Sequence, residues 1–308
     1  MCIRDRLSAL ELDLEARGHL WLDEADQDVH LQMEPFVATL RGPFREGEGV
    51  FTLLNLPFSL LALFAPIPPS LTGAVGINGR YRLDGGLPGI EADLVLDNAK
   101  LGEDALVLDR KEVIFGPDGL KLDLALRSSG SQEPITVRGS IPLRSDEDIN
   151  VLIESHNDAL TFLTQLAGES LKVKRGSTDL RLILRGSLEE PQANGFLVVQ
   201  NADVVFGGQG LQNLQASLLF DFNRLEVQKL NAKLASGGSL KGAGAIGLFD
   251  ARTEQQPLSL KLSDGSIRHS IVEVKAEADL TVTGSLLDPV FAGEVNLNRG
   301  VILSLIHI

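Results

Sequence analysis

Apolar and polar residues alternate along most of the chain, and the alternation is clearest at residues 272–282. There Val, Ala and Leu occupy every second position, and Glu, Lys, Asp and Thr stand between them. Alternate side chains of a β-strand point to opposite faces, so one face of this segment is expected to be apolar and the other polar. Leucine runs beginning at Leu12, Leu120, Leu180 and Leu258 repeat the pattern. With Gly, Asn, Asp and Pro between the runs, the sequence predicts antiparallel strands on short turns with one solvated face.

Two segments interrupt this alternation and are typical of short helices. Residues 56–64 are almost continuously apolar and precede a proline-rich stretch, whereas residues 157–168 carry an Asn-Asp start and a Gly end. The longest apolar stretch, residues 56–67, is interrupted by prolines and falls short of the roughly 20 residues that a membrane-spanning helix requires.

A longer period underlies the alternation. Pro88, Pro191 and Pro289 are 103 and 98 residues apart, and the residues that follow them correspond position by position. The corresponding residues are Ala92, Gly195 and Gly293; Leu94, Leu197 and Val295; Leu96, Val199 and Leu297; and Asn98, Asn201 and Arg299. The segment Gly-Ser-Ile-Pro-Leu at 139–143 likewise returns as Gly-Ala-Ile-Gly-Leu at 244–248. Such self-similarity predicts stacked repeats.

The repeat predicts one elongated segment over residues 7–303. Its units of about 100 residues are expected at approximately 56–155, 156–265 and, in part, 266–303. Residues 1–6 and 304–308 look like translated sequencing-adapter sequence. We therefore expect these ends to be non-native and the chain to be an internal fragment.

The composition favours a curled sheet over a closed globule. The chain is 44% hydrophobic but only 5% aromatic, and it contains 31 glycines, which can serve as bend points. We predict a mainly β fold in which a long curled antiparallel sheet forms an open apolar groove, with one or two short helices. An exposed apolar trough needs an apolar occupant, and acyl chains need no directional polar partner. The residues predicted to line the groove are Leu94, Leu96, Leu122, Leu124, Leu180, Leu182, Leu184, Leu258, Leu260, Val272, Val274, Leu280, Val282, Val295 and Leu297.

Charge and cysteine content exclude several function classes. A formal net charge of -14 argues against nucleic-acid binding, and a single Cys excludes a disulfide framework. The acidic clusters at 23–28 and 146–148 lack a full calcium-ligand register, and His19, His30, His156 and His269 lack zinc spacing. Gly-Ala-Gly-Ala-Ile-Gly at 242–247 matches a dinucleotide motif but is followed by strand-like alternation, so we interpret it as a Gly-rich strand. We expect no cofactor, no metal site and no catalytic residues.

The ordered series of repeat units resembles a known family. Residues 184–202, 283–300 and the proline-rich segment 56–76 are similar to the recurring unit of the TamB (translocation and assembly module) family of the AsmA-like group. The resemblance covers about residues 7–303 and implies a β-taco groove in the periplasm, in a parent chain anchored in the inner membrane. It implies a bridge-type lipid transport role, phospholipid as cargo, outer-membrane biogenesis, and an Omp85-type barrel as a partner that docks outside this segment.

Other functions stay open at this point. The chain could be a structural or assembly scaffold for outer-membrane protein insertion or secretion, with a dry β core, or an adhesin-like solenoid. It could also be a β-rich enzyme acting on polysaccharide, although few aromatic residues are present for sugar stacking. Adhesive solenoids usually repeat every 20–30 residues, well below the period of about 100 in this chain.

Overall fold

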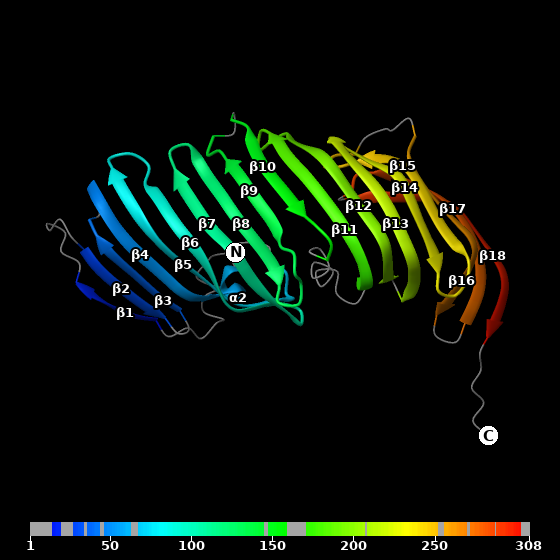
Figure 1. Ribbon diagram of the computed structural model, residues 1–308, viewed down its shortest axis with the longest axis horizontal. Helices are drawn as coiled ribbons and strands as arrows, with labels where there is room; N and C mark the ends of the chain where they lie inside the picture. The colour runs from blue at the N-terminus through cyan, green and yellow to red at the C-terminus, as the bar shows by residue number, and fades with distance from the viewer. Residues whose placement is uncertain are drawn as a thin grey trace, which may run out of the picture. The chain divides into compact units, whose positions relative to one another are not determined.

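A computed structural model describes the chain over residues 14–19, 27–33, 36–43, 46–62, 67–144, 147–158, 171–206, 208–251, 256–269, 272–286 and 288–302. Within these ranges it contains strands β1 to β18 and one short helix, α2 (Figure 1). The chain divides into two compact units, residues 1–151 and 152–308. Each unit is described by itself.

The first unit is an antiparallel meander in which each strand from β1 to β8 pairs with the next one along the chain. Its strands are β1 (Leu14–His19), β2 (Gln27–Met33), β3 (Phe36–Gly42), β4 (Glu46–Pro57), β5 (Leu71–Asp84), β6 (Gly89–Leu101), β7 (Asp104–Gly116), β8 (Gly119–Ser128) and β9 (Ile135–Ile141). Strand β10 (Ile149–Ser155) spans the boundary between the units.

The second unit continues the same kind of meander from β11 to β18. Its strands are β11 (Leu171–Gly186), β12 (Pro191–Phe206), β13 (Gln209–Phe222), β14 (Arg224–Leu234), β15 (Ser239–Gly247), β16 (Leu258–His269), β17 (Val272–Gly284) and β18 (Pro289–Ile302). The prediction of a mainly β, antiparallel fold with little helix is thus confirmed.

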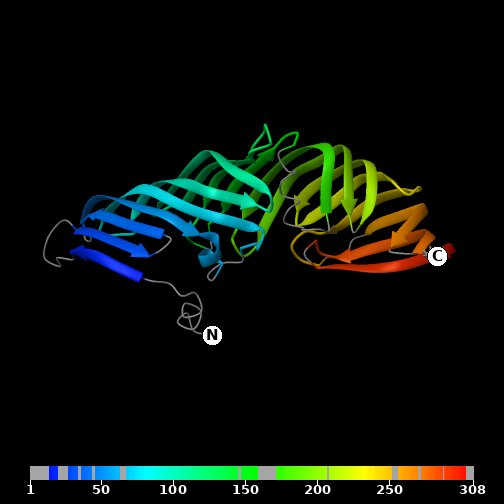
Figure 2. The ribbon, with the colours of Figure 1, turned by 90° about the horizontal axis from the view of Figure 1, so that it is seen from below.

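The sheet of the second unit is strongly curled. An isolated bridge joins Gly247, at the end of β15, to Ser285, just after β17, although β16 lies between these strands in the pairing order. Strands two apart in a flat sheet lie roughly 10 Å from each other, so this bridge requires the sheet to bend. In Figure 2 the orange and red strands β16–β18 turn back below the green strands β11–β13.

Glycines make the bend possible on the apolar face. Gly242 lies opposite Leu230 on one side and Leu260 on the other, and a Cβ added there would sit 2.8 Å from Leu260 Cδ2 and 3.1 Å from Leu230 Cδ2. The two leucines therefore occupy the space that a side chain would take. Gly195 has φ +151°, and a Cβ there would lie 1.9 Å from the Arg181 carbonyl oxygen, so only glycine fits.

The correspondence between repeat positions appears in the backbone as a recurring β-bulge. Asn98 on β6 and Asn201 on β12 both have positive φ, 47° and 50°, and each lies beside a register shift with the preceding strand. Gly73 and Gly176 lie close to these bulges. A Cβ added at Gly73 would lie 2.4 Å from the Asn98 carbonyl oxygen, and a Cβ added at Gly176 would lie 2.6 Å from Ala202 Cβ. The predicted unit boundaries themselves stay a prediction.

The predicted helices differ in outcome. Helix α2 covers only Phe58–Leu61, because β4 extends through Pro57 by pairing with Ala74 of β5. Pro57, at φ -64° and ψ 141°, precedes the helix, and Phe58 is buried. The helix predicted at residues 157–168 lies almost entirely outside the described residues.

Candidate apolar binding face

The predicted groove residues of the first unit lie on one face. Leu94 and Leu96 stand opposite Ile77 and Val75 of β5. Residues that oppose each other in neighbouring strands share a face, and so do alternate residues within a strand. Ala92, which is two residues before Leu94, pairs with Val113 of β7, and Val113 pairs with Leu122 of β8. Leu122 and Leu124 therefore share the face of Leu94, and all four leucines are half-buried.

The predicted residues of the second unit are brought together in the same way. Leu258 pairs with Val282, and Leu260 pairs with Leu280. Leu182, Leu184, Leu258 and Leu260 all pack against one buried cluster that includes Val282. Leu180 shares their face because it alternates with Leu182 and pairs with Leu197. Val272 and Val274 have the same parity on β17, but their side chains lie outside the described part.

Strand β18 carries the most exposed members of the predicted set. Val295 and Leu297 pair with Ala278 and Ala276 of β17, which places them on the apolar face. They are nevertheless 55% and 65% exposed, while Val282 on β17 is 3% exposed. Among the described residues β18 pairs with β17 alone, so its apolar side chains are covered from one side only.

Part of the concave face in the second unit is filled by the chain itself. The buried cluster consists of Ala193, Leu225, Ile246, Leu248 and Val282. Leu248 follows the end of β15, and Phe249 beside it packs against the same cluster. We call residues 247–251 the strap, because hydrogen bonds join them to the β13–β14 turn and to the β17–β18 turn.

Main-chain and side-chain hydrogen bonds hold the strap at both turns. The Leu248 N–H donates to the Asn223 carbonyl oxygen (2.9 Å), and the Leu286 N–H donates to the Gly247 carbonyl oxygen (2.8 Å). The Phe249 N–H donates to Asn223 Oδ1 (3.0 Å), and Asn223 Nδ2 donates to Asp250 Oδ2 (3.4 Å). Thus the groove of the second unit is closed at this edge.

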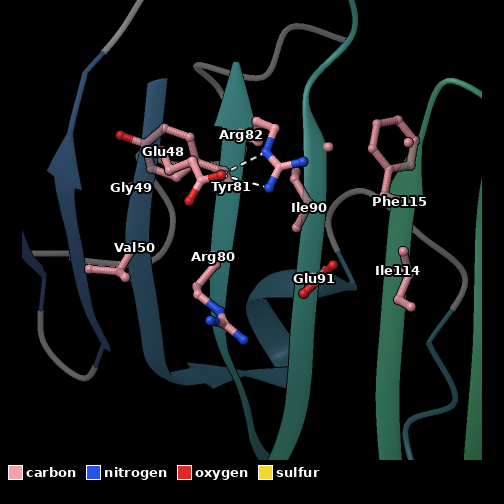
Figure 3. Close-up of a pocket in the computed structure, with 12 residues that line it drawn as sticks. Glu48, Gly49, Val50, Arg80, Tyr81, Arg82, Ile90, Glu91, Ile114 and Phe115 are labelled. Atoms are coloured by element: carbon pink, nitrogen blue, oxygen red, sulfur yellow. Dashed lines mark hydrogen bonds and ion pairs between the residues drawn. The ribbon is translucent and has the colours of Figure 1, made fainter. Parts of the chain in front are cut away.

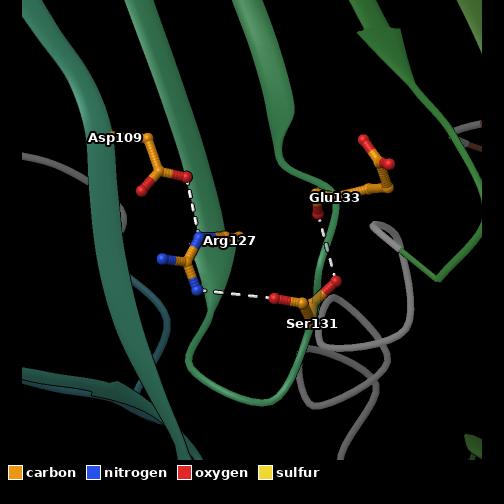
Figure 4. Close-up of polar contacts among 4 residues, drawn as sticks. All are labelled: Asp109, Arg127, Ser131 and Glu133. Atoms are coloured by element: carbon orange, nitrogen blue, oxygen red, sulfur yellow. Dashed lines mark hydrogen bonds and ion pairs between the residues drawn. The ribbon is translucent and has the colours of Figure 1, made fainter.

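The alternation places polar residues on the opposite face, where ion pairs connect neighbouring strands. Arg127 of β8 donates from Nε to Asp109 Oδ2 of β7 (2.7 Å) and from Nη1 to the Ser131 carbonyl oxygen (3.4 Å), while Ser131 Oγ donates to the Glu133 carbonyl oxygen (3.0 Å; Figure 4). The hydrogen bond with Asp109 raises the pKa of Arg127. These contacts tie β7, β8 and the following loop together.

A second charged pair joins β11 to β12. The Arg175 guanidinium donates from Nε to Asp203, and the main-chain N–H of Asn213 donates to the same carboxylate (3.0 Å). The hydrogen bond from Arg175, and then that from Asn213, lower the pKa of Asp203. These charged groups therefore have a structural role, because they hold the β-bulge of β12 against its neighbouring strands.

A cavity of about 420 Å³ opens near the β5–β6 turn of the first unit (Figure 3). Its lining mixes the Arg82–Glu48 ion pair, with Nη2–Oε1 at 2.6 Å, and the apolar residues Tyr81 and Phe115. The buried Tyr81 hydroxyl donates to the Pro43 carbonyl oxygen (3.0 Å), so the tyrosine pins the adjoining β3–β4 turn. The ion pair is largely exposed and contributes little to stability.

Several other sequence motifs have structural roles. The Gly-rich motif at 242–247 lies within β15, as interpreted from the sequence. His156 Nδ1 lies 3.0 Å from Asp179 Oδ1, and Glu147 of the second acidic cluster pairs with Arg144. Over the described ranges no group of three or more His, Cys, Asp or Glu side chains is placed to hold a metal ion. No helix in this part of the chain is long and apolar enough to cross a membrane.

Comparison with known proteins yields no relative. No family model, no curated protein and no solved structure matches the chain.

Sequence reasoning missed part of the apolar face. Leu248 and Phe249 belong to it through the strap, Ile246 through β15, and Leu218 and Leu225 through β13 and β14. The short alternations Leu218/Phe220 and Leu225/Val227 were a usable signal. The strap had none, because its position depends on hydrogen bonds to turns distant in sequence.

Proposed function

We propose that this chain is a non-enzymatic segment of a periplasmic envelope protein that conducts phospholipid acyl chains between the inner and outer membranes. In this proposal the parent chain is anchored in the inner membrane, and an Omp85-type barrel is its partner at the outer membrane. The observation that carries the proposal is the register, which in each unit gathers the predicted leucines and valines on one face of a curled sheet.

Partial burial of these residues supports an apolar cargo. Leu94, Leu96, Leu122 and Leu124 are neither exposed nor fully buried, so acyl chains can cover the area that they leave to water. Transfer of one methylene group from water to such a surface contributes about 0.8 kcal/mol, so ten methylenes contribute roughly 8 kcal/mol. The apolar face provides this energy along its length and requires no directional polar contact, which suits a mobile chain.

Lipid analysis of the purified protein tests this proposal directly. The chain would be expressed with export to the periplasm, purified in the absence of detergent and analysed by native mass spectrometry. We expect adducts with phospholipid masses that disappear after organic extraction. Bare protein that also fails to bind an added fatty acid would reject lipid conduction.

A dry-cored assembly scaffold is the second candidate, and the closed cluster of the second unit favours it. Ala193, Leu225, Ile246, Leu248 and Val282 are each at most 6% exposed, so no cargo reaches them in this conformation. On this alternative, the same purification yields protein without lipid and with a cooperative unfolding transition. The two candidates thus predict opposite outcomes in one measurement.

A further inference from the structure

The strap places two apolar side chains in the concavity of the second unit. Leu248 is 6% exposed and belongs to the buried cluster with Ala193, Leu225 and Val282, and Phe249 packs against that cluster. Leu248 and Phe249 thus add their side chains to a cluster of apolar residues. The buried Ser285 lies beside it, bridged to Gly247.

Gly247 begins the strap within the β14–β15 ladder, where it pairs with Arg224, and the other bonds that hold the strap lie beyond the strand ladders. Two of the four hydrogen bonds use the side chain of Asn223, a turn residue, and a third uses its carbonyl oxygen. The fourth joins Gly247 to Leu286, which is 51% exposed in the β17–β18 turn. Release of the strap breaks these bonds and one isolated bridge but leaves the pairing of β13 with β14 and of β17 with β18 intact.

The repeat supplies an internal comparison. Leu248 corresponds in the sequence repeat to Leu143, and Gly247 corresponds to Pro142. Leu143 is 45% exposed, so the corresponding segment of the first unit does not insert its leucine. A Cβ at Gly247 would lie 2.0 Å from the Asp250 carbonyl oxygen, so the tight path of the strap also requires the glycine that the first unit lacks.

We propose that the space under the strap is an acyl-chain subsite, and that Leu248 and Phe249 occupy it when no ligand is bound. The ligand is one saturated hydrocarbon tail, since it would replace the Leu248 and Phe249 side chains within a cluster of apolar residues. The inference rests on the proposed lipid-binding function and adds to it a closed state specific to the second unit. Asn223 acts as the clamp that sets the balance between the closed and open states.

A reversible lock tests the subsite. In a Cys2→Ser background, Asn223→Cys and Asp250→Cys are oxidised to a disulfide that a reductant cleaves, since the two side chains lie 3.4 Å apart. The probe is a saturated fatty acid with a diazirine near its methyl end, and labelled peptides are assigned to each unit by mass spectrometry. We expect the lock to lower labelling around Leu182 and Leu260 at least fivefold, cleavage to restore it, and labelling around Leu94 and Leu122 to stay constant.

A single substitution tests the same idea in the opposite direction. Asn223→Ala removes both side-chain bonds to the strap and is expected to raise labelling of the second unit at least threefold. Ser187→Ala is the matched control, because Ser187 Oγ accepts the Glu190 N–H in the β11–β12 turn without contacting the strap. Circular dichroism checks that each variant keeps its β content.

The outcomes separate this inference from the function on which it rests. Labelling of the second unit that is equal with and without the lock, or absent there while the first unit is labelled, overturns the subsite. Absence of labelling in both units, in every state of the strap, rejects lipid binding itself.

Discussion

At the scale of single residues, the repeat position occupied by Ala92, Gly195 and Gly293 shows how the backbone selects its side chain. Ala92 is buried and has no positive φ, whereas Gly195 and Gly293 have φ values of +151° and +145°. A Cβ at Gly293 would lie 2.1 Å from the Asp279 carbonyl oxygen. Alanine is thus compatible with the first repeat and incompatible with the other two.

Gly195→Ala should therefore destabilise the second unit by about 2 kcal/mol or more, because alanine at this φ is strained and its methyl group meets the Arg181 carbonyl. Urea unfolding measures the change. Ala92→Gly is the reciprocal control and should cost only about 1 kcal/mol. If Gly195→Ala raised the unfolding midpoint, as Gly→Ala does at unstrained sites, the positive φ would be wrong.

The pKa of Asp203 leads to a prediction about pH. Because Arg175 and Asn213 hold this pKa below its usual value, the folded chain favours the carboxylate. The resulting stabilisation is present above the unfolded-state pKa of about 3.9 and is lost as the pH falls through the lower folded-state pKa. Asp203→Asn should lower Tm at pH 7, and the difference from wild type should vanish in acid. A difference that persisted unchanged at pH 2 would contradict the assignment.

At the scale of elements, β6 and β7 of the first unit pair only near their two ends. Residues 90–93 pair with 112–115, and 100–101 pair with 104–105, but residues 94–99 and 106–111 form no ladder pairs with each other although both strands are fully described. A β-bulge lies on each strand in this interval, at Asn98 and between Leu108 and Arg110. The two bulges together account for the open seam.

Main-chain amides that face this seam should exchange hydrogen quickly. We expect exchange at least about tenfold faster in residues 94–99 and 106–111 than in residues 194–199, which pair with β13. Hydrogen–deuterium exchange with mass spectrometry gives the comparison within one sample. Equal protection of the two segments would show that β6 and β7 are joined in solution.

The sequence predicted the features that depend on neighbouring residues and missed those that depend on contacts between distant segments. Alternation within a strand is a local signal, and it correctly placed Leu94, Leu122 and Leu260 on apolar faces. The predicted start of the helix at residue 56 was wrong because pairing of Pro57 with Ala74 extends β4 into the apolar run. The strap and the seam depend on contacts between turns or bulges far apart in sequence, which periodicity does not encode.

At the scale of the whole molecule, the two units present the same apolar pattern in different states. In the first unit Leu94 is half-buried and faces Ile77 across the strand pair. In the second, Leu182 packs against a cluster sealed by the strap. A charge introduced at the two positions should therefore have different consequences, and this contrast separates a conduit from a dry scaffold.

We predict that Leu94→Asp keeps the fold and abolishes lipid photo-labelling of the first unit, while Leu182→Asp unfolds the second unit. A carboxylate beside acyl chains costs several kcal/mol, but at Leu94 water can solvate it once the cargo is absent. At Leu182 the charge enters a packed cluster, and the loss approaches the whole stability margin of a domain. Circular dichroism melting and labelling with the diazirine fatty acid are measured on each variant.

Val95→Asp is the matched control, because Val95 lies on the opposite face of the same strand and should leave labelling unchanged. Collapse of the first unit by Leu94→Asp would show that its apolar face is a core. Retained fold with undiminished labelling would show that the lipid contacts another surface. Retained fold with lost labelling, together with a normal Val95→Asp variant, would establish the apolar face of the first unit as the path of the acyl chains.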